Sequence, residues 1–178
     1  MPLDIGVGIV LALGAAESFG VEATPWLVVF GIACALLPDI DILTIPLLGK
    51  WHHRTHTHFP ILYVPLSILA FLLVEPLYAT IFTLGVFAHL VHDTFGIEWG
   101  IAWLWPFTPR KFLVFPSELK PTHGVLATWL PSESPERRET AQHASSWVRH
   151  YYFRPNLLAY IEYGVLAIAL VILAIYFS

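Results

Sequence analysis

The sequence consists largely of long apolar runs separated by short polar segments. Five runs approach the roughly 20 residues that a helix needs to span a bilayer. They cover about Leu3–Val21, Pro25–Leu48, Pro60–Val74, Leu77–Phe95 and Asn156–Phe177. This pattern predicts an all-α fold, an integral membrane bundle of about five transmembrane helices.

The first run raises the question of whether it is a cleaved signal peptide. It is interrupted by Glu17, and its small residues around Ala15 resemble a cleavage site. However, no lysine or arginine precedes the run, and a signal peptide needs a basic leading region. We therefore expect the run to be kept as a span, with a four-span protein as the alternative.

The segment between the fourth and fifth runs has a different character. Residues 99–107 are aromatic but too short to span, so we expect them to be interfacial or re-entrant. Residues 116–155 are polar, and Ser134–Glu136 has the pattern of a helix start. Apolar positions at helical spacing then extend to Tyr151, which predicts one amphipathic interfacial helix. We interpret residues 1–178 as a single membrane domain that contains this polar segment.

Composition agrees with a membrane protein and excludes some function classes. Hydrophobic residues make up 57% of the chain and charged residues only 12%, about half the charged fraction of an ordinary soluble domain. The net charge of -4 and the lack of a basic stripe argue against a nucleic-acid partner. Cys34 stands alone in an apolar run, so we expect a packed core residue and not an intrachain disulfide.

The basic residues predict the orientation in the membrane. With five spans, all of them fall in loops on one side: Lys50, Arg54, Arg110, Lys111, Lys120, Arg137, Arg138, Arg149 and Arg154. Only Glu17, Glu22 and Glu75 lie near the opposite side. The positive-inside rule therefore predicts a multi-pass protein of the cytoplasmic (inner) membrane with its N-terminus in the cytoplasm.

Ionisable residues gather at the same predicted cytoplasmic ends. They are Asp39, Asp41, His53, His56, His58, His89, His92, Asp93 and Glu162. His89 and Asp93 are four residues apart on a predicted helix, so their side chains share one face. Pro38 removes a backbone donor and loosens the helix, which would let Asp39 and Asp41 both turn inward. Carboxylates near hydrocarbon usually face a functional site, although structural or proton-handling roles are the alternative.

These residues form motifs that resemble a prokaryotic family of membrane-bound metal-dependent hydrolases, described in part as LexA-binding, inner-membrane-associated proteins. The motifs are Leu37–Asp41, His53–His58, His89–Asp93, Gly96 and Trp105-Pro106, in matching order over roughly residues 31–107. Two positions depart from the family pattern, because Phe59 replaces an expected serine and Asp4 replaces a frequent histidine. Asp4 is a substitute candidate for a ligand on the first helix. No residue by itself supports LexA binding.

The ligand chemistry predicts a divalent metal site. Neutral imidazole and ionised carboxylate suit zinc first, with manganese or iron as alternatives. The expected ligands are Asp39, Asp41, His53, His58, His89 and Asp93, and six ligands suit two ions better than one. Glu162 is a further candidate ligand, whose alternative is an ion pair with Arg154. His123, His143 and His150 lie in the polar segment and are expected to be ordinary surface histidines.

The leading functional hypothesis is a metal-dependent hydrolase at the cytoplasmic membrane face, with a phosphoester or lipid-linked substrate. Arg54 would bind a phosphate or stabilise negative charge, and His56 or His92 would act as general acid or base. The His-x-x-x-Asp block is also similar to part of the zinc sites of zinc-dependent phospholipase C. The alternative is a divalent metal-ion transporter or binding protein that uses the same residues. The aspartates argue against haem.

Overall fold

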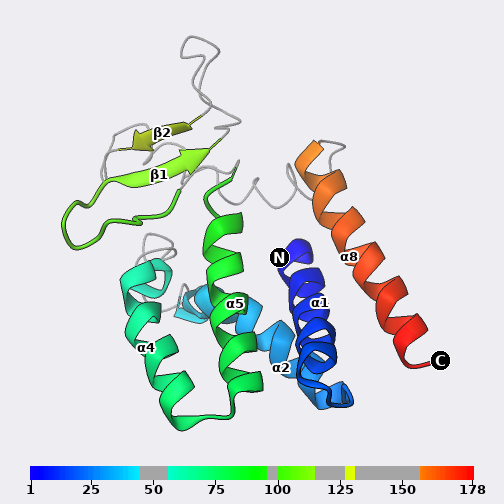
Figure 1. Ribbon diagram of the computed structural model, residues 1–178. Coiled ribbons are helices and arrows are strands. Elements are labelled where there is room, and N and C mark those ends of the chain that lie inside the picture. The colour runs from blue at the N-terminus through cyan, green and yellow to red at the C-terminus, as the bar shows by residue number, and fades with distance from the viewer. Residues whose placement is uncertain (45–55, 96–99, 115–126, 131–156) are drawn as a thin grey trace. The chain divides into compact units, whose positions relative to one another are not determined.

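The computed structural model describes residues 1–44, 56–95, 100–114, 127–130 and 157–178 (Figure 1). Several predictions fall outside these residues: the end of the second run, the candidates His53 and Arg54, the motif residue Gly96 and the amphipathic helix after Ser134. The expected surface histidines His123, His143 and His150 and the alternative partner Arg154 also lie outside them. The chain divides into two compact units. The first comprises Met1–Pro38, Tyr63–His89 and Leu157–Ser178, and the second comprises Asp39–Leu62 and Leu90–Asn156.

The first unit is helical, and its helices begin where the sequence pattern predicts. They are α1 (Pro2–Phe19), α2 (Pro25–Leu36), most of α4 (Pro60–Leu73), most of α5 (Pro76–His92) and α8 (Leu157–Tyr176). Helices α1, α2, α4 and α5 begin with a proline. At the first position of a helix, the missing N–H of proline breaks no intrahelical hydrogen bond. At the start of α2, the Thr24 hydroxyl accepts a hydrogen bond from the Leu27 amide at 3.2 Å.

Helices α1 and α2 pack with their backbones in direct contact. A Cβ added to Gly31 would lie 2.4 Å from the Gly8 carbonyl oxygen, and one added to Gly8 would lie 2.6 Å from Ile32 Cα. Only glycine allows two helices to approach this closely. The buried core beside this crossing comprises Ile9, Ala12, Leu13, Ala16, Ala23, Leu27, Val28, Ile81 and Ala169.

The length of the helices decides which of them can cross a membrane. In the part of the chain that the structure describes, three helical segments are long and apolar enough, namely Pro2–Phe19, Pro25–Leu43 and Ala159–Tyr176. Helices α4 and α5 are apolar but have only 14 and 17 residues, and 14 residues rise about 21 Å against a hydrocarbon core of about 30 Å. The mainly helical membrane fold is therefore confirmed among the described residues, whereas a bundle of five spans is not.

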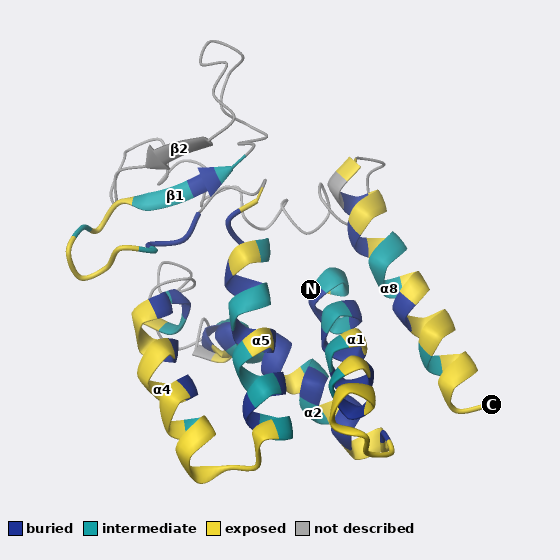
Figure 2. Ribbon diagram, in the orientation of Figure 1, coloured by how far each residue is buried: buried dark blue, intermediate teal, exposed yellow. Residues whose placement is uncertain are grey.

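Helices α4 and α8 turn large apolar side chains outward (Figure 2). Leu72 and Leu73 of α4 are 74% and 73% exposed, and Ile175 of α8 is 70% exposed. Contiguous apolar faces of this extent are rare on proteins that fold in water. They are typical of surfaces that face lipid chains, which are as apolar as leucine.

The second unit consists of short elements and includes a sheet that the sequence pattern did not predict. Its elements are the 3₁₀ helices η1 (Leu37–Thr44) and η3 (His56–His58) and the strands β1 (Lys111–Val114) and β2 (Ala127–Leu130). The strands pair antiparallel, with Lys111 opposite Leu130. The pair was missed because four-residue strands in a polar and aromatic segment show no clear alternation.

Strand β1 is also held by the segments that precede it. Ile101 and Phe112 exchange two backbone hydrogen bonds of 2.9 and 2.7 Å, and the Val114 amide donates to the Thr94 carbonyl at 2.7 Å. Gly100 adopts a positive φ of 56°, and a Cβ there would lie 2.5 Å from the Phe112 carbonyl oxygen. Glycine is therefore required at this approach.

Candidate metal centre

The two aspartates after α2 project from a change in helical winding. The α-helix ends at Leu36 and the chain continues as the 3₁₀ helix η1. Residues two apart lie about 160° from one another around an α-helix but only about 120° apart around a 3₁₀ helix. This narrower angle brings Asp39 and Asp41 toward the same neighbour, as we expected from Pro38.

That neighbour is His58, the last residue of η3, whose side chain is only 1% exposed. Its Nε2 atom lies 3.4 Å from Asp39 Oδ1 and 3.3 Å from Asp93 Oδ2. Its Nδ1 atom lies 3.5 Å from Asp41 Oδ2 and 3.1 Å from the Thr57 hydroxyl. Asp39 and Asp93 thus meet one ring nitrogen, and Asp41 and Thr57 meet the other.

Asp93 is positioned by the end of helix α5. The helix ends at His92, and the Thr94 and Phe95 amides donate to the carbonyls of Val91 and His92 at 3.0 and 2.9 Å. The Thr94 hydroxyl donates to the Leu90 carbonyl at 2.8 Å and accepts from the Trp103 indole N–H at 2.9 Å. These bonds hold the turn that carries Asp93.

His89 lies one turn before Asp93 on α5, so the spacing along this helix places it beside Asp93. One ligand atom from each of Asp39, His58, His89 and Asp93 lies within 4.8 Å of the others. We call these four residues the metal cluster. His58, His89 and Asp93 are buried, and Asp39 is half-buried. Two imidazole nitrogens and two carboxylate oxygens form a donor set that suits zinc, manganese or iron.

A further carboxylate contacts His89 within the first unit. Asp4 of α1, which is 2% exposed, places Oδ1 3.2 Å from His89 Nδ1. Asp4 was noted in the sequence only as a substitute for a family histidine and was not among the expected ligands. The pattern that could have revealed it is a carboxylate inside an otherwise apolar helix, because such a residue usually faces a polar partner.

Glu162 lies on α8 and is also buried, at 3% exposure. Its Oε2 atom is 3.6 Å from the amino group of Met1, which is 2.8 Å from Asp4 Oδ2. The structure thus brings Glu162 near Asp4 within the first unit. Glu162 is not one of the four residues of the metal cluster, and its role as a ligand stays a prediction.

The remaining candidates lie in different positions. His56 is exposed at the start of η3, and its ring packs edge-on against Phe59. His92 is half-buried at the last position of α5. The described residues include neither His53 nor Arg54, so their proposed roles stay predictions. Asp41 is buried beside His58 but contacts the nitrogen opposite the one that faces Asp39 and Asp93.

The carboxylates around His58 have a clear electrostatic effect. Burial acts to lower the pKa of His58, but hydrogen bonds to the three surrounding aspartates raise it from 6.5 to about 9. The metal-free protein therefore keeps a proton on His58 at neutral pH. A site that holds a positive charge in this way also favours a divalent cation, which must displace that proton.

Comparison with known proteins places the chain in a family. Residues 4–178 match the model of the family described as YdjM inner membrane protein. No curated protein and no solved structure matches the chain. The matched region includes every residue of the metal cluster and all the described helices from Asp4 onward, so the chain belongs to the YdjM inner membrane protein family.

Proposed function

We propose that this protein is a membrane-embedded, metal-dependent hydrolase that acts on a phosphoester at the cytoplasmic face. The observation that carries the proposal is the metal cluster, in which Asp39, His58, His89 and Asp93 bring their ligand atoms within 4.8 Å. Burying ionisable side chains in a membrane protein is costly, and such residues usually belong to a functional site. The donor set also matches that of metal-dependent hydrolases more closely than that of a haem site.

The two histidines of the cluster are oriented in the same way. Asp41 contacts Nδ1 of His58, and Asp4 contacts Nδ1 of His89. A carboxylate at one ring nitrogen fixes the ring and makes the other nitrogen a better metal ligand. We therefore assign Asp4 and Asp41 as orienting residues, and His58 and His89 as ligands through Nε2.

A divalent cation in the cluster would act as a Lewis acid and lower the pKa of a water molecule toward neutrality. The protein's own residues would bind and orient the substrate. We propose that Arg54 pairs with two phosphate oxygens, which its planar guanidinium suits. His56 is exposed on η3, two residues before His58, and is the candidate for donating a proton to the leaving oxygen. His92 is the second candidate.

Metal content and hydrolysis, measured on the same samples, test the proposal. Protein purified without chelators should contain zinc, manganese or iron, and Asp93→Asn should remove most of it because a charged ligand is lost. Asp41→Asn is the matched control: it also removes one buried aspartate charge, but should weaken binding by only about 10- to 100-fold. Wild-type protein should hydrolyse members of a phosphoester panel that includes lipid-linked compounds.

The same experiment distinguishes the alternative function. Metal uptake into proteoliposomes, without hydrolysis of any panel member, would assign the cluster to metal transport. Equal metal content in wild type, Asp93→Asn and Asp41→Asn would show that the cluster is not a metal site and would contradict both functions.

A further inference from the structure

Near the metal cluster, the second unit exposes a turn rich in large apolar side chains. We call residues 103–107 the aromatic turn. Phe107 is 90% exposed, Leu104 50% and Trp105 39%. Single exposed apolar residues are common on protein surfaces, but three on one short turn form a patch that calls for a partner.

The aromatic turn is fixed to the segment that carries Asp93. The Trp103 indole donates to the Thr94 hydroxyl at 2.9 Å, and Thr94 directly follows Asp93. The segment before the turn pairs with β1 through Ile101 and Phe112. The turn therefore keeps a defined position beside Asp93 and is not a freely moving loop tip.

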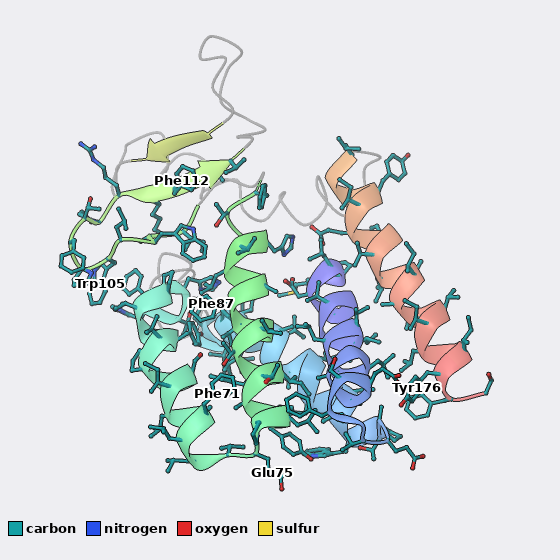
Figure 3. The ribbon with its side chains drawn as sticks, viewed as in Figure 1. Phe71, Glu75, Phe87, Trp105, Phe112 and Tyr176 are labelled. Carbon is teal, nitrogen blue, oxygen red and sulfur yellow. The ribbon has the colours of Figure 1, made fainter. Side chains whose placement is uncertain are left out.

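A second contact joins the turn to the segment that carries His58. The rings of Trp105 and Phe59 stack, with centroids 4.6 Å apart and planes 8° from parallel. Figure 3 shows Trp105 on the loop that precedes β1 and Phe112 on β1 itself. Phe59 follows His58 directly in the sequence. The aromatic surface thus adjoins two ligand-bearing segments of the metal cluster.

The nearby basic residues and the apolar helix that follows Phe59 indicate which partner this surface fits. Among the described residues, the only lysine and arginine are Lys111 and Arg110, and both lie within four positions of Phe107. Phe59 directly precedes the first residue of the apolar helix α4. Aromatic side chains and basic residues at the end of an apolar helix are typical of the membrane interface, where rings enter the acyl region and cations meet anionic headgroups.

We propose that the aromatic turn and Phe59 form a lipid-docking surface that enters the bilayer interface and presents the headgroup of an anionic phospholipid to the metal cluster. The inference rests on the proposed function for its chemistry and selects a lipid phosphomonoester as substrate. In the reaction, a water oxygen bonds to phosphorus and the ester P–O bond breaks. The lipid alcohol takes up a proton, and inorganic phosphate is released.

A fluorescent label tests the docking without any measurement of activity. The variant Cys34→Ala/Phe107→Cys carries an environment-sensitive dye in nanodiscs of phosphatidylcholine and phosphatidylglycerol. Lipids with brominated acyl chains should quench the dye at least twofold, and aqueous iodide should quench it weakly. A dye on Cys34→Ala/Glu22→Cys, in the exposed loop between α1 and α2, provides the aqueous reference. If iodide quenches the two labels equally and bromine quenches neither, the lipid-docking surface is overturned.

Hydrolysis tests the choice of substrate. Phosphatidic acid and glycerol phosphate share the phosphomonoester but differ in their acyl chains. Phe107→Asp should lower the ratio of phosphatidic acid to glycerol phosphate hydrolysis about tenfold, since it removes the burial of one aromatic ring. Phe107→Leu keeps an apolar side chain, so its ratio of phosphatidic acid to glycerol phosphate hydrolysis should stay close to that of the wild type. Arg110→Gln should lower it more than Arg110→Lys does.

The outcomes separate this inference from the proposed function. Bromine quenching without hydrolysis of either compound would support the docking surface and contradict the hydrolase. Hydrolysis of both compounds at a ratio that Phe107→Asp does not change would support the hydrolase and overturn lipid selection by the turn. Conversion of a dimer to a monomer by Phe107→Asp, without bromine quenching at position 107, would assign the surface to a second copy of the chain.

Discussion

At the scale of single residues, the two histidines of the metal cluster share one feature. Each has an aspartate at Nδ1, which is Asp41 for His58 and Asp4 for His89. For His58, two further aspartates lie at Nε2. This concentration of negative charge raises the pKa of His58 to about 9 in the metal-free protein. Proton and metal therefore compete for the same ring.

The competition predicts that metal affinity depends on pH. Below a pKa of about 9, each ion that binds must displace the proton of His58, so affinity should rise by up to about tenfold per pH unit between pH 6.5 and 8.5. Equilibrium titration with cobalt, followed by its absorbance, would measure this. His56→Asn, an exposed neighbour on the same element, should leave the slope unchanged. An affinity that is flat with pH would show that His58 is not a ligand.

Arg54 provides a second prediction at this scale. If its guanidinium grips a phosphate, Arg54→Lys should keep metal content but lower phosphoester hydrolysis about tenfold or more, because lysine lacks the bidentate geometry. Rates on the phosphoester panel, normalised to bound metal, would test it. Equal rates for the two proteins would reduce Arg54 to a basic residue that only sets topology.

At the scale of secondary structure, the change of winding after α2 and the close packing of α1 on α2 position the carboxylates near the two histidines. The transition from α2 to η1 turns Asp39 and Asp41 toward His58. The contact of α1 with α2 at Gly8 and Gly31 fixes the helix that carries Asp4. Within the first unit, Asp4 of α1 contacts His89 of α5.

A glycine substitution tests the packing of α1 on α2. In Gly31→Ala, the new Cβ would lie 2.4 Å from the Gly8 carbonyl oxygen, so we expect a loss of about 1–3 kcal/mol in stability. Gly14→Ala is the matched control, since nothing lies within 4 Å of its Cβ, and it should be neutral or slightly stabilising. Thermal unfolding of both variants in detergent would compare them. Equal stability would contradict the close approach of the two backbones.

At the scale of the whole molecule, the chain belongs to an inner membrane protein family. Its described residues include three helical segments long enough to cross the bilayer. Helices α4 and α5 are shorter and are separated only by Val74 and Glu75. They would either cross a locally thinned membrane or enter and leave on one side as a helical hairpin. The five-span prediction and the three-span arrangement therefore differ in where Glu75 lies.

Labelling of single cysteines in intact cells tests this topology. In a Cys34→Ala background, Glu22→Cys should react with an impermeant reagent, whereas Lys120→Cys should react only after permeabilisation, because the basic loops are predicted to be cytoplasmic. Ready labelling at Lys120→Cys from outside would reverse the orientation. Reaction of Glu75→Cys in intact cells would support five spans, and its protection would support a hairpin.

The sequence by itself predicted where the described helices begin and named all four residues of the metal cluster as candidate ligands. Long apolar runs, proline at helix starts and the four-residue spacing of His89 and Asp93 are properties of neighbouring residues, and local patterns report these directly. The same reasoning identified Asp39, Asp41 and His58 as candidates. It also anticipated the helix break at Pro38, because proline removes a backbone donor wherever it occurs.

Only the tertiary structure decided how these side chains divide their roles. Asp39 and Asp93 meet one nitrogen of His58 and Asp41 the other, and Asp4 reaches His89 from a helix far away in the sequence. The stacking of Trp105 on Phe59 beside the metal cluster likewise depends on distant segments coming together. Such contacts are set by the packing of backbones, as at Gly8 and Gly31, and residue spacing along one chain does not encode which ring nitrogen faces which carboxylate.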